Sequence, residues 1–519
     1  MSEGNSEVPH QPTNPTALDY DPVVPARRRD GDDSGDEDPW PARHARDFAE
    51  SDVPYVEDPT CDSAAVGVKV KTSSLVKVKT SSLVKTSSLS SSHLDAGEIL
   101  KRGHALGFAG LFLFTAFLYF RPYELIPSLS FLSSGAYYIA FLTLLVFIPS
   151  QIGLEGTLTV RPREVNLVLL LALFALLSLP LAINHGEAWD TFTEYLKVVV
   201  MFVVMVNVVR TERRLRLLMM LVLAASCVIA WSAVSDYRAG NLTVEGYRVA
   251  GVIGGIFGNP NDLALHLATM IPLAVALFLA SRGLHKKLVY AACAALMVGG
   301  LMVTYSRGGF LGLAAGALVL AWKLGRRNRL VVMLTTLFVV ALVLALAPGN
   351  YGDRMASIFN KSLDLSGSSG ARQELLIVSI KVALQHPLFG VGMGNFHIVS
   401  IQEHVSHNAY TQVAAEMGLA AGLVYLLFLL ASLKRLRRVE RETLSERTHT
   451  RFYYLAVGLQ ASLVAYMASS FFASVAYQWY VYYLIGYAFC LSRLYETQMM
   501  AQSQRQQQAT IDGHAVLTQ

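Results

Sequence analysis

The chain is poor in charged residues and in cysteine, and each shortage excludes a class of protein. Charged residues make up 16% of its 519 residues and hydrophobic residues 53%, which excludes an ordinary soluble domain over most of the length. The four cysteines, Cys61, Cys227, Cys293 and Cys490, form no CxxC pair, so neither a disulfide framework nor a zinc site is predicted. No apolar stretch lies near Met1, and we therefore expect the first membrane span to target the chain.

Long apolar runs fill the sequence from about Ala105 onward. Each has about the 20 residues needed to cross the hydrocarbon core of a bilayer, and one soluble core cannot bury so many. The sequence therefore predicts an all-α polytopic membrane protein with about 12 transmembrane helices. The predicted spans lie near residues 105–120, 134–149, 165–183, 195–209, 214–234, 262–280, 287–304, 308–323, 329–347, 410–433, 451–474 and 476–493.

Lysine and arginine recur in every second loop between these spans, and the positive-inside rule uses this pattern to orient a membrane protein. The pattern places both termini in the cytoplasm and requires an even number of spans. It also places the longest loop, residues 348–409 between spans nine and ten, on the other side. The basic residues that decide the orientation are Lys101, Arg102, Arg161, Arg163, Arg210, Arg213, Arg214, Arg216, Arg282, Lys286, Lys287, Lys323, Arg326, Arg327, Arg329, Lys434, Arg435, Arg437, Arg438 and Arg493.

The spans divide the chain into three segments. Residues 1–103 have few apolar side chains and are predicted to be a disordered cytoplasmic tail. Residues 104–495 form the transmembrane domain, and residues 496–519 are predicted to be a second disordered cytoplasmic tail. Within the first tail, the octet VKVKTSSL occurs twice and is followed by VKTSSL. This repeat is either a low-complexity expansion without a fold or a phosphorylatable segment that associates with anionic lipid.

Three stretches on the predicted outer face have the residue types that chemistry requires. The first joins Arg248 to the sequence GNPND, in which Asn259 and Asn261 precede an apolar run as helix N-caps do. Such a helix end also binds anions. The second is SRGG, a tight turn whose glycines allow helices to approach closely and hold Arg307. The third runs from Arg372 through an interfacial helix and HPLFGVGMGNF to HNAY at residues 407–410.

Other ionisable residues near the spans have two interpretations each. Lys197 is either functional, as intramembrane charges often are, or the partner of Glu194 three residues earlier. Glu416 is expected to lie inside span ten and to pair with an arginine rather than to react. His266 is expected to be buried and hydrogen-bonded. Arg238 and Arg354 are expected to extend to lipid headgroups, and His386, His397 and His404 have no metal-ligand spacing.

In these residues the sequence resembles the O-antigen ligase and polymerase family of bacterial membrane proteins. The matching stretches are RPYELIP after span one, GNPND before span six, SRGG before span eight, HPLFGVGMGNF in the large loop, and HNAY with a following Glu-Met-Gly. The resemblance extends over about residues 105–493 and excludes the N-terminal tail. It implies an all-helical, glycosyltransferase-C-like fold in the bacterial inner membrane, with a large periplasmic loop and a periplasmic active face.

The family moves glycans from an undecaprenyl-diphosphate carrier to an acceptor hydroxyl, which belongs to lipid A-core, a protein or another glycan. Arginine holds phosphate oxygens in a bidentate manner, so Arg248, Arg307 and Arg372 are the candidates for the diphosphate. His407 stands at the position of the family's essential histidine and is the candidate base; without the resemblance, a helix-capping or interfacial histidine is the alternative. Asn259, Asn261, Glu416 and Lys197 are candidate supporting residues. No metal, cofactor or nucleic acid is expected, since no acidic DxD-like pair lies on an outer loop.

Three other functions remain open from the sequence. A polymerase of the same family needs the same diphosphate site and base, and differs in its acceptor. A transporter also has many spans and a few buried charges, but no repeat of two halves is visible here. A scaffold of an envelope complex would transfer no glycan, so it would be indifferent to the loss of His407.

Overall fold

A computed structural model shows an all-helical, multi-pass membrane protein and describes most of the chain beyond residue 103. The described residues are 104–132, 134–242, 244–251, 253, 255–325, 351–358, 368–444 and 451–517, with isolated positions between 329 and 349. The predicted N-terminal tail and its repeats lie outside these residues. In the part of the chain that is described, no β-strand is formed; a single isolated bridge joins Val244 to Arg248.

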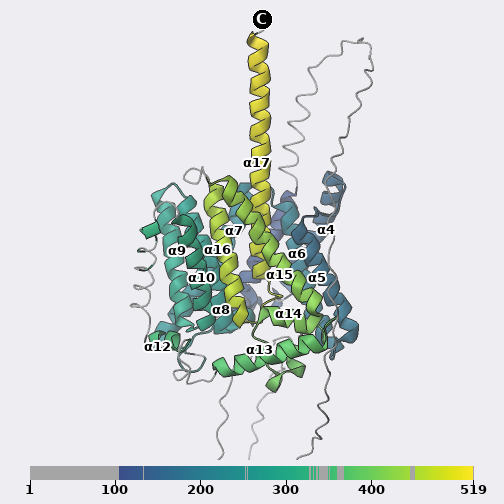
Figure 1. Cartoon of the computed structure of the whole chain (residues 1–519), viewed down its shortest axis with the longest axis vertical. Coiled ribbons are helices and arrows are strands. Elements are labelled where there is room, and N and C mark those ends of the chain that lie inside the picture. Colours follow the sequence, from purple (N-terminus) through teal and green to yellow (C-terminus); the bar gives the residue numbers. More distant parts are fainter. Residues whose placement is uncertain are drawn as a thin grey trace, which may run out of the picture. The chain divides into compact units, whose positions relative to one another are not determined.

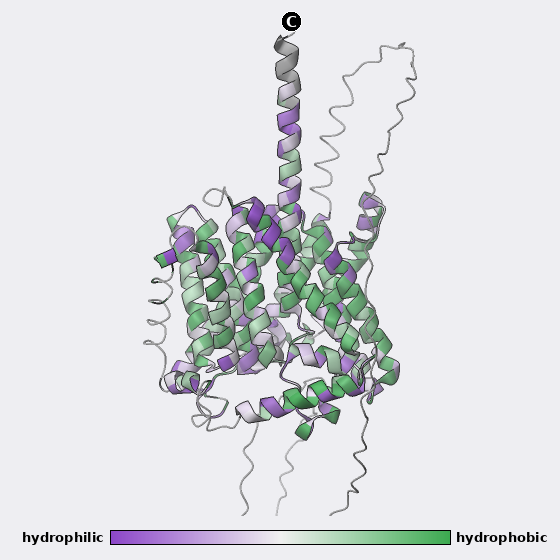
Figure 2. Ribbon diagram, viewed as in Figure 1, coloured by the Kyte–Doolittle hydropathy of each residue, from purple (hydrophilic) through white to green (hydrophobic). Residues whose placement is uncertain are grey.

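Ten helices among the described residues are long and apolar enough to cross a membrane. The labelled helices of this set stand upright side by side in Figure 1, and the colours of Figure 2 mark most of their residues as hydrophobic. The ten helices are α2 (Ala105–Phe120), α4 (Gly135–Glu155), α5 (Arg163–Ser178), α6 (His185–Val208), α7 (Glu212–Ala239), α8 (Pro260–Ala280), α9 (Leu284–Val303), α10 (Arg307–Leu324), α15 (Leu419–Glu442) and α16 (Arg451–Ser469).

The predicted count of twelve spans is therefore confirmed for ten. The ninth predicted span, at residues 329–347, lies almost entirely outside the described residues. The twelfth lies within α17 (Trp479–Leu517), which is not among the ten. Its first part contains several tyrosines, and Tyr480, Tyr482 and Tyr487 are buried in the main core.

The predicted disordered tail after residue 495 is wrong for residues 496–517, because α17 continues without a break to Leu517. Glutamine, methionine and alanine, which favour helix, dominate this extension. Its side chains from Glu496 to Gln507 are exposed along nearly the whole length, so the extension is a helix that other described parts of the chain do not cover.

Helix α8 lies at the centre of the packing. Its apolar window is 78% buried, whereas that of α4 is only 12% buried, so α8 is enclosed by other helices and most of the α4 window is left uncovered by the described protein. Helices α9, α10 and α16 pack directly against α8. Small residues allow α10 to approach α8: a Cβ on Gly309 would meet Ala264 Cβ at 2.5 Å, and one on Gly316 would lie 3.3 Å from Pro272 Cγ.

One end of the bundle carries the remaining helices, and we call it the motif end. It is the end at which α8 and α10 begin. The short helices there are α3 (Pro122–Leu125), α12 (Tyr351–Ala356), α13 (Ser368–Gln385) and α14 (Ala409–Met417), with 3₁₀ turns η1 (Pro127–Leu132), η2 (Leu179–Leu181), η3 (Gly255–Gly258), η5 (Phe396–Val399), η6 (Ile401–Glu403) and η7 (Ser470–Phe472). Helix α13 lies across the ends of the upright helices (Figure 1), as the sequence predicts for an interfacial helix.

At the opposite end, arginines of the predicted basic stretches form ion pairs with glutamates of α4 and α5. Arg435 makes a bidentate pair with Glu164, at 2.6 and 2.9 Å. Arg210 pairs with Glu155 at 2.5 Å, and Arg493 lies 3.9 Å from the same carboxylate. The loops that the sequence identifies by their positive charge therefore meet at one end of the bundle.

Candidate active site

The motif GNPND forms the capped start of α8. Asn259 is the N-cap, and its side-chain oxygen accepts a hydrogen bond from the Asn261 backbone N–H at 2.8 Å. Pro260 takes the first helical position, where the absence of an N–H costs nothing. The cap leaves the side chain of Asn261 free to point toward other elements at the motif end.

Asn261 joins two of the three predicted motifs. Its Oδ1 accepts a hydrogen bond from Arg248 Nη2 at 2.9 Å and another from Ser306 Oγ at 3.0 Å. Ser306 is also the N-cap of α10, where it accepts from the Gly309 N–H. Arg248 and SRGG, far apart in sequence, thus meet at one amide side chain.

Arg248 is buried, with 5% of its surface exposed, and each part of its guanidinium has a partner. Nε donates to the Thr304 carbonyl at 2.8 Å, and Nη1 lies 3.3 Å from Glu245 Oε1. Burial lowers the pKa of Arg248, and the carboxylate of Glu245 acts against this. Arg248 therefore stays charged in a fixed orientation.

Arg307 begins α10 beside the short helix α12. Its Nη1 donates to Ser357 Oγ at 3.1 Å, directly after the end of α12. Phe472, in the turn that follows α16, lies against Gly308, where an added Cβ would approach its Cβ to 3.1 Å. The glycines of SRGG thus allow the close approach that the sequence predicts, and the start of α10 is held from two sides.

Arg372, in the first turns of α13, lies within electrostatic reach of the other arginines. Burial, and then the charges of Arg248, Arg307 and Arg354, lower the pKa of Arg372 to about 10, and the carboxylate of Asp262 acts in the opposite direction. Four guanidinium groups from four separate segments therefore share one region. Such a concentration of positive charge attracts a multiply charged anion.

His407 lies next to this region, immediately before Asn408, the N-cap of α14. Burial, and then the charges of Arg372 and His404, lower the pKa of His407 to about 3. The imidazole is therefore neutral at neutral pH and has a nitrogen lone pair available. Its backbone is in the left-handed region with φ 49°, a conformation that costs a non-glycine residue on the order of 1 kcal/mol or more.

The predicted position of Glu416 inside span ten is wrong. The apolar run breaks at Gly418, whose φ of 94° ends α14, and the spanning helix α15 starts only at Leu419. A side chain at Gly418 would collide with the Leu388 carbonyl. A glycine is therefore required, and the run of apolar residues does not reveal the break.

The predicted arginine partner of Glu416 is also wrong. Glu416 accepts a hydrogen bond from Tyr477 Oη at 2.6 Å and further hydrogen bonds from the backbone amides of Gly394 and Phe396. It forms no ion pair with any residue that the structure describes. Burial raises the pKa of Glu416 to about 7, and the donated hydrogen bonds act against this. Glu416 thus holds the loop HPLFGVGMGNF against α14.

Lys197 is not brought to the arginine region. It pairs with Glu194 at 2.6 Å, and 39% of the lysine side chain and 72% of the glutamate side chain are exposed. The ion pair between Lys197 and Glu194, which was one of the two interpretations of Lys197, therefore explains both of these charged residues. His266 is buried as predicted, with Nε2 at 2.9 Å from Ser226 Oγ.

Two residues at this site were not identified from the sequence. Arg354, expected at the headgroups, instead lies 3.7 Å from Glu245 and above the ring of Tyr247 at 5.7 Å. Glu245 holds both Arg248 and Arg354. Its position three residues before Arg248 was a weak signal, but nothing near Arg354 in the sequence indicates its partners.

Comparison with known proteins agrees with the motif-based resemblance. The model of the family described as O-antigen ligase matches residues 292–426, a segment that contains Arg307, Arg372 and His407. No curated protein matches the chain. Within the described part of the chain, no group of three or more His, Cys, Asp or Glu side chains is arranged to hold a metal ion. The resemblance is confirmed over this segment: the chain carries an O-antigen ligase family domain at residues 292–426.

Proposed function

We propose that the protein is a ligase-type glycosyltransferase that moves a glycan from an undecaprenyl-diphosphate carrier to an acceptor hydroxyl. The observation that supports this most directly is the approach of Arg248, Arg307 and Arg372 to one another beside His407. A diphosphate leaving group needs several fixed positive charges, and an acceptor hydroxyl needs a neutral base nearby. Both requirements are met by residues at the motif end.

The arginines hold the leaving group. As the bond between the anomeric carbon and the diphosphate oxygen breaks, its electron pair passes to that oxygen and the negative charge there increases. Arg248 is already oriented by Asn261 and Thr304, so it needs no reorganisation when the charge develops. This preorganisation is stronger in a buried site than in water, because the local dielectric constant is lower.

His407 takes the proton of the acceptor hydroxyl as the oxygen of that hydroxyl bonds to the anomeric carbon. Burial and the charge of Arg372 lower its pKa to about 3, so it is neutral but a weak base. A bound diphosphate offsets the positive charge of Arg372, the second cause of the lowered pKa after burial, and so raises the pKa of His407. Binding of the donor therefore strengthens the base at the moment when it is needed.

The motif end faces the periplasm in this proposal, with both termini in the cytoplasm of a bacterial inner membrane. The basic loops that orient the chain meet at the opposite end, where Arg210, Arg435 and Arg493 are paired with glutamates. This arrangement supports the orientation, because the positive-inside rule assigns that end to the cytoplasm. The lipid-linked donor then reaches the arginines from the outer leaflet.

Loss of His407 tests the proposal. In cells that contain only the His407→Ala protein, we expect normal insertion and no glycan transfer, and the same for Arg307→Ala. His386→Ala is the matched control, since His386 is an exposed histidine of the same loop. Normal length and attachment of surface glycan in the His407→Ala cells would refute the proposal and favour a scaffold.

A polymerase of the same family is the second candidate, and it uses the same diphosphate site and base. Deletion of the gene separates the two. Full-length polymer left on the lipid carrier indicates a missing ligase, whereas single capped repeats indicate a missing polymerase. Purified protein that moves the lipid-linked glycan across vesicles without forming a new glycosidic bond would favour a transporter.

A further inference from the structure

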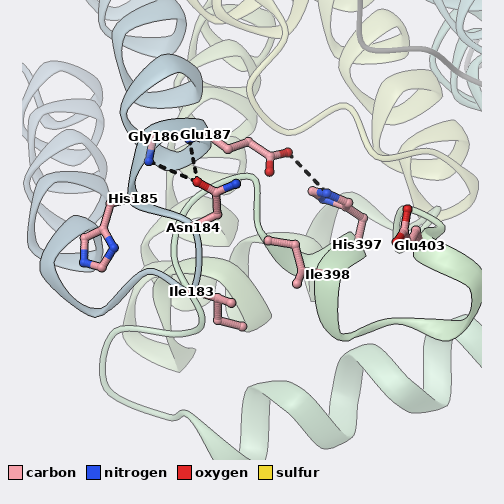
Figure 3. Close-up of a pocket in the computed structure, with 8 residues that line it drawn as sticks. All are labelled: Ile183, Asn184, His185, Gly186, Glu187, His397, Ile398 and Glu403. Carbon is pink, nitrogen blue, oxygen red and sulfur yellow. Dashed lines mark hydrogen bonds and ion pairs between the residues drawn. The ribbon is translucent and has the colours of Figure 1, made fainter.

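A pocket separate from the arginine region opens at the motif end between the start of α6 and the turns η5 and η6 (Figure 3). Its volume is about 670 Å³, which is large enough for a ligand of several rings. Glu187 and His185 come from α6, and His397, Ile398 and Glu403 come from the loop. None of these residues takes part in the mechanism proposed above.

The side chains in the pocket suit hydroxyl groups. Glu187 and His397 face each other with Oε1 and Nε2 at 3.3 Å, and about a quarter of each side chain is exposed (Figure 3). Glu403 presents a second carboxylate. Carboxylates accept strong hydrogen bonds from hydroxyl donors, and Ile183 and Ile398 supply apolar surface for the carbon faces of a ring.

The arginine region and the pocket have opposite charges, so they favour different parts of a substrate. The arginine region attracts anions, whereas Glu187 and Glu403 repel them. The two carboxylates therefore disfavour a diphosphate in the pocket and favour a neutral polyhydroxylated ligand there. The pocket thus fits the sugar part of the substrate and the arginines fit its phosphate part.

The pocket wall is built rigidly, so the pocket exists before a ligand binds. The Asn184 N–H donates to Asn395 Oδ1 at 2.7 Å, which fastens the loop to the start of α6. Gly392 and Gly394 have φ of 100° and 81°, and a side chain on either would collide with Ala182 or Thr191. The glycines of GVGMGNF are therefore required for this close contact.

Glu416 connects this wall to the reacting end. It accepts the backbone N–H groups of Gly394 and Phe396, and it lies in the last turn of α14. His407 lies just before the other end of α14. Glu403, which lines the pocket, lies four residues before His407, so the pocket and the reacting site are neighbours. Neither His407 nor any arginine of the arginine region lines the pocket, so we place there a sugar other than the one that reacts.

We infer that this pocket is a subsite for a neutral sugar of a glycan chain whose reacting end lies at the arginine region. The inference rests on the proposed function, because it takes the substrate to be a glycan. The chain in the pocket belongs either to the donor or to the acceptor, since both carry the same hydroxyl chemistry. The affinity for the substrate then depends on glycan length through this pocket, while the new glycosidic bond forms beside His407.

The test uses the full-length protein in lipid nanodiscs and the double variant Glu187→Gln, Glu403→Gln. Lipid-linked donors and acceptors with one to several repeat units are compared. We expect the KM of the long substrate to rise roughly tenfold, as expected for lost charge-assisted hydrogen bonds, while single-repeat substrate reacts as with wild type. Glu194→Gln, on the same helix but paired outside the pocket with Lys197, is the matched control and should change nothing.

Comparison of the donor series with the acceptor series identifies which glycan chain the pocket binds. A rise that follows donor length assigns the pocket to the donor, and one that follows acceptor length assigns it to the acceptor. Equal kinetics of the variant and wild type at every length would overturn the inference. So would a loss that is the same for short and long substrates. Ile398→Trp is a second variant, which narrows the pocket without changing its charge and should give the same length dependence.

Direct binding separates this inference from the proposed function. Oligosaccharide released from the cell's own lipid-linked glycan is added to the protein, and saturation-transfer NMR measures its binding. Binding that survives His407→Ala and is lost in Glu187→Gln, Glu403→Gln supports the subsite whether or not transfer occurs. Transfer by wild type with no difference between these variants in binding leaves the proposed function standing and refutes the subsite.

Discussion

Replacement of Asn261 by alanine is the most informative single change at the arginine region. It removes the acceptor that Arg248 Nη2 and Ser306 Oγ share, at 2.9 and 3.0 Å. A hydrogen bond to a charged group contributes about 1.5–3 kcal/mol and a neutral one about 0.5–1.5 kcal/mol. Arg248 keeps Thr304 and Glu245, so we take the lower sum, about 2 kcal/mol, which corresponds to a fall in kcat/KM of roughly 30-fold.

The assay is transfer of a lipid-linked glycan by purified protein in nanodiscs, with kcat and KM measured separately. Asn166→Ala is the matched control, because Asn166 is an exposed asparagine in α5. Asn261→Asp retains an acceptor of the same shape but places a carboxylate beside Arg248. We expect it to raise the KM for the donor, since it cancels the charge that holds the diphosphate. Activity within about twofold of wild type for both Asn261 variants would refute the role of Arg248, because each hydrogen bond is worth more than that.

Three further changes give distinct results. The dependence of kcat/KM on pH reports the pKa values of groups in the free enzyme. Because the pKa of His407 is lowered to about 3, we expect kcat/KM to stay level from about pH 8 to about pH 5. Arg372→Gln removes a positive charge near His407, so the fall of kcat/KM in acid should begin at a higher pH. The pKa of Glu416 is raised to about 7, so the wild type should lose stability as pH rises from its usual pKa through 7. Thermal unfolding of Glu416→Gln should lack this dependence, whereas Glu416→Ala, which leaves several donors unpaired, should be less stable at every pH by about 1–3 kcal/mol. Arg354→Ala should raise the KM for the donor severalfold, because Arg354 lies in the arginine region. Arg238→Ala is the control and should leave this KM unchanged, since Arg238 is exposed. Equal effects of the two variants would show that Arg354 does not contribute to donor binding.

Much of the fold follows from the sequence alone. Runs of apolar residues determine that a segment spans the membrane, because the bilayer leaves the backbone no other partners than its own. Ten of the predicted spans are therefore found as helices long and apolar enough to cross a membrane, and α13 lies across the end of the bundle. The break at Gly418 and the helical extension after residue 495 are not predicted. Both depend on single contacts or on helix propensity that hydrophobicity does not measure.

The separate parts of the site also follow from the sequence. Asn259 is recognisable as a cap because an N-cap is a local structure, and Arg248, Arg307 and His407 stand out in the motifs at the predicted outer ends of the spans. What the sequence does not determine is which of these parts meet. Asn261 with Ser306, Arg354 with Glu245, and Glu416 with the loop at Gly394 are contacts between segments far apart in the chain. Only the packing of α8, α10, α13 and α14 decides them, because a charge in a sequence has no partner until the chain is folded.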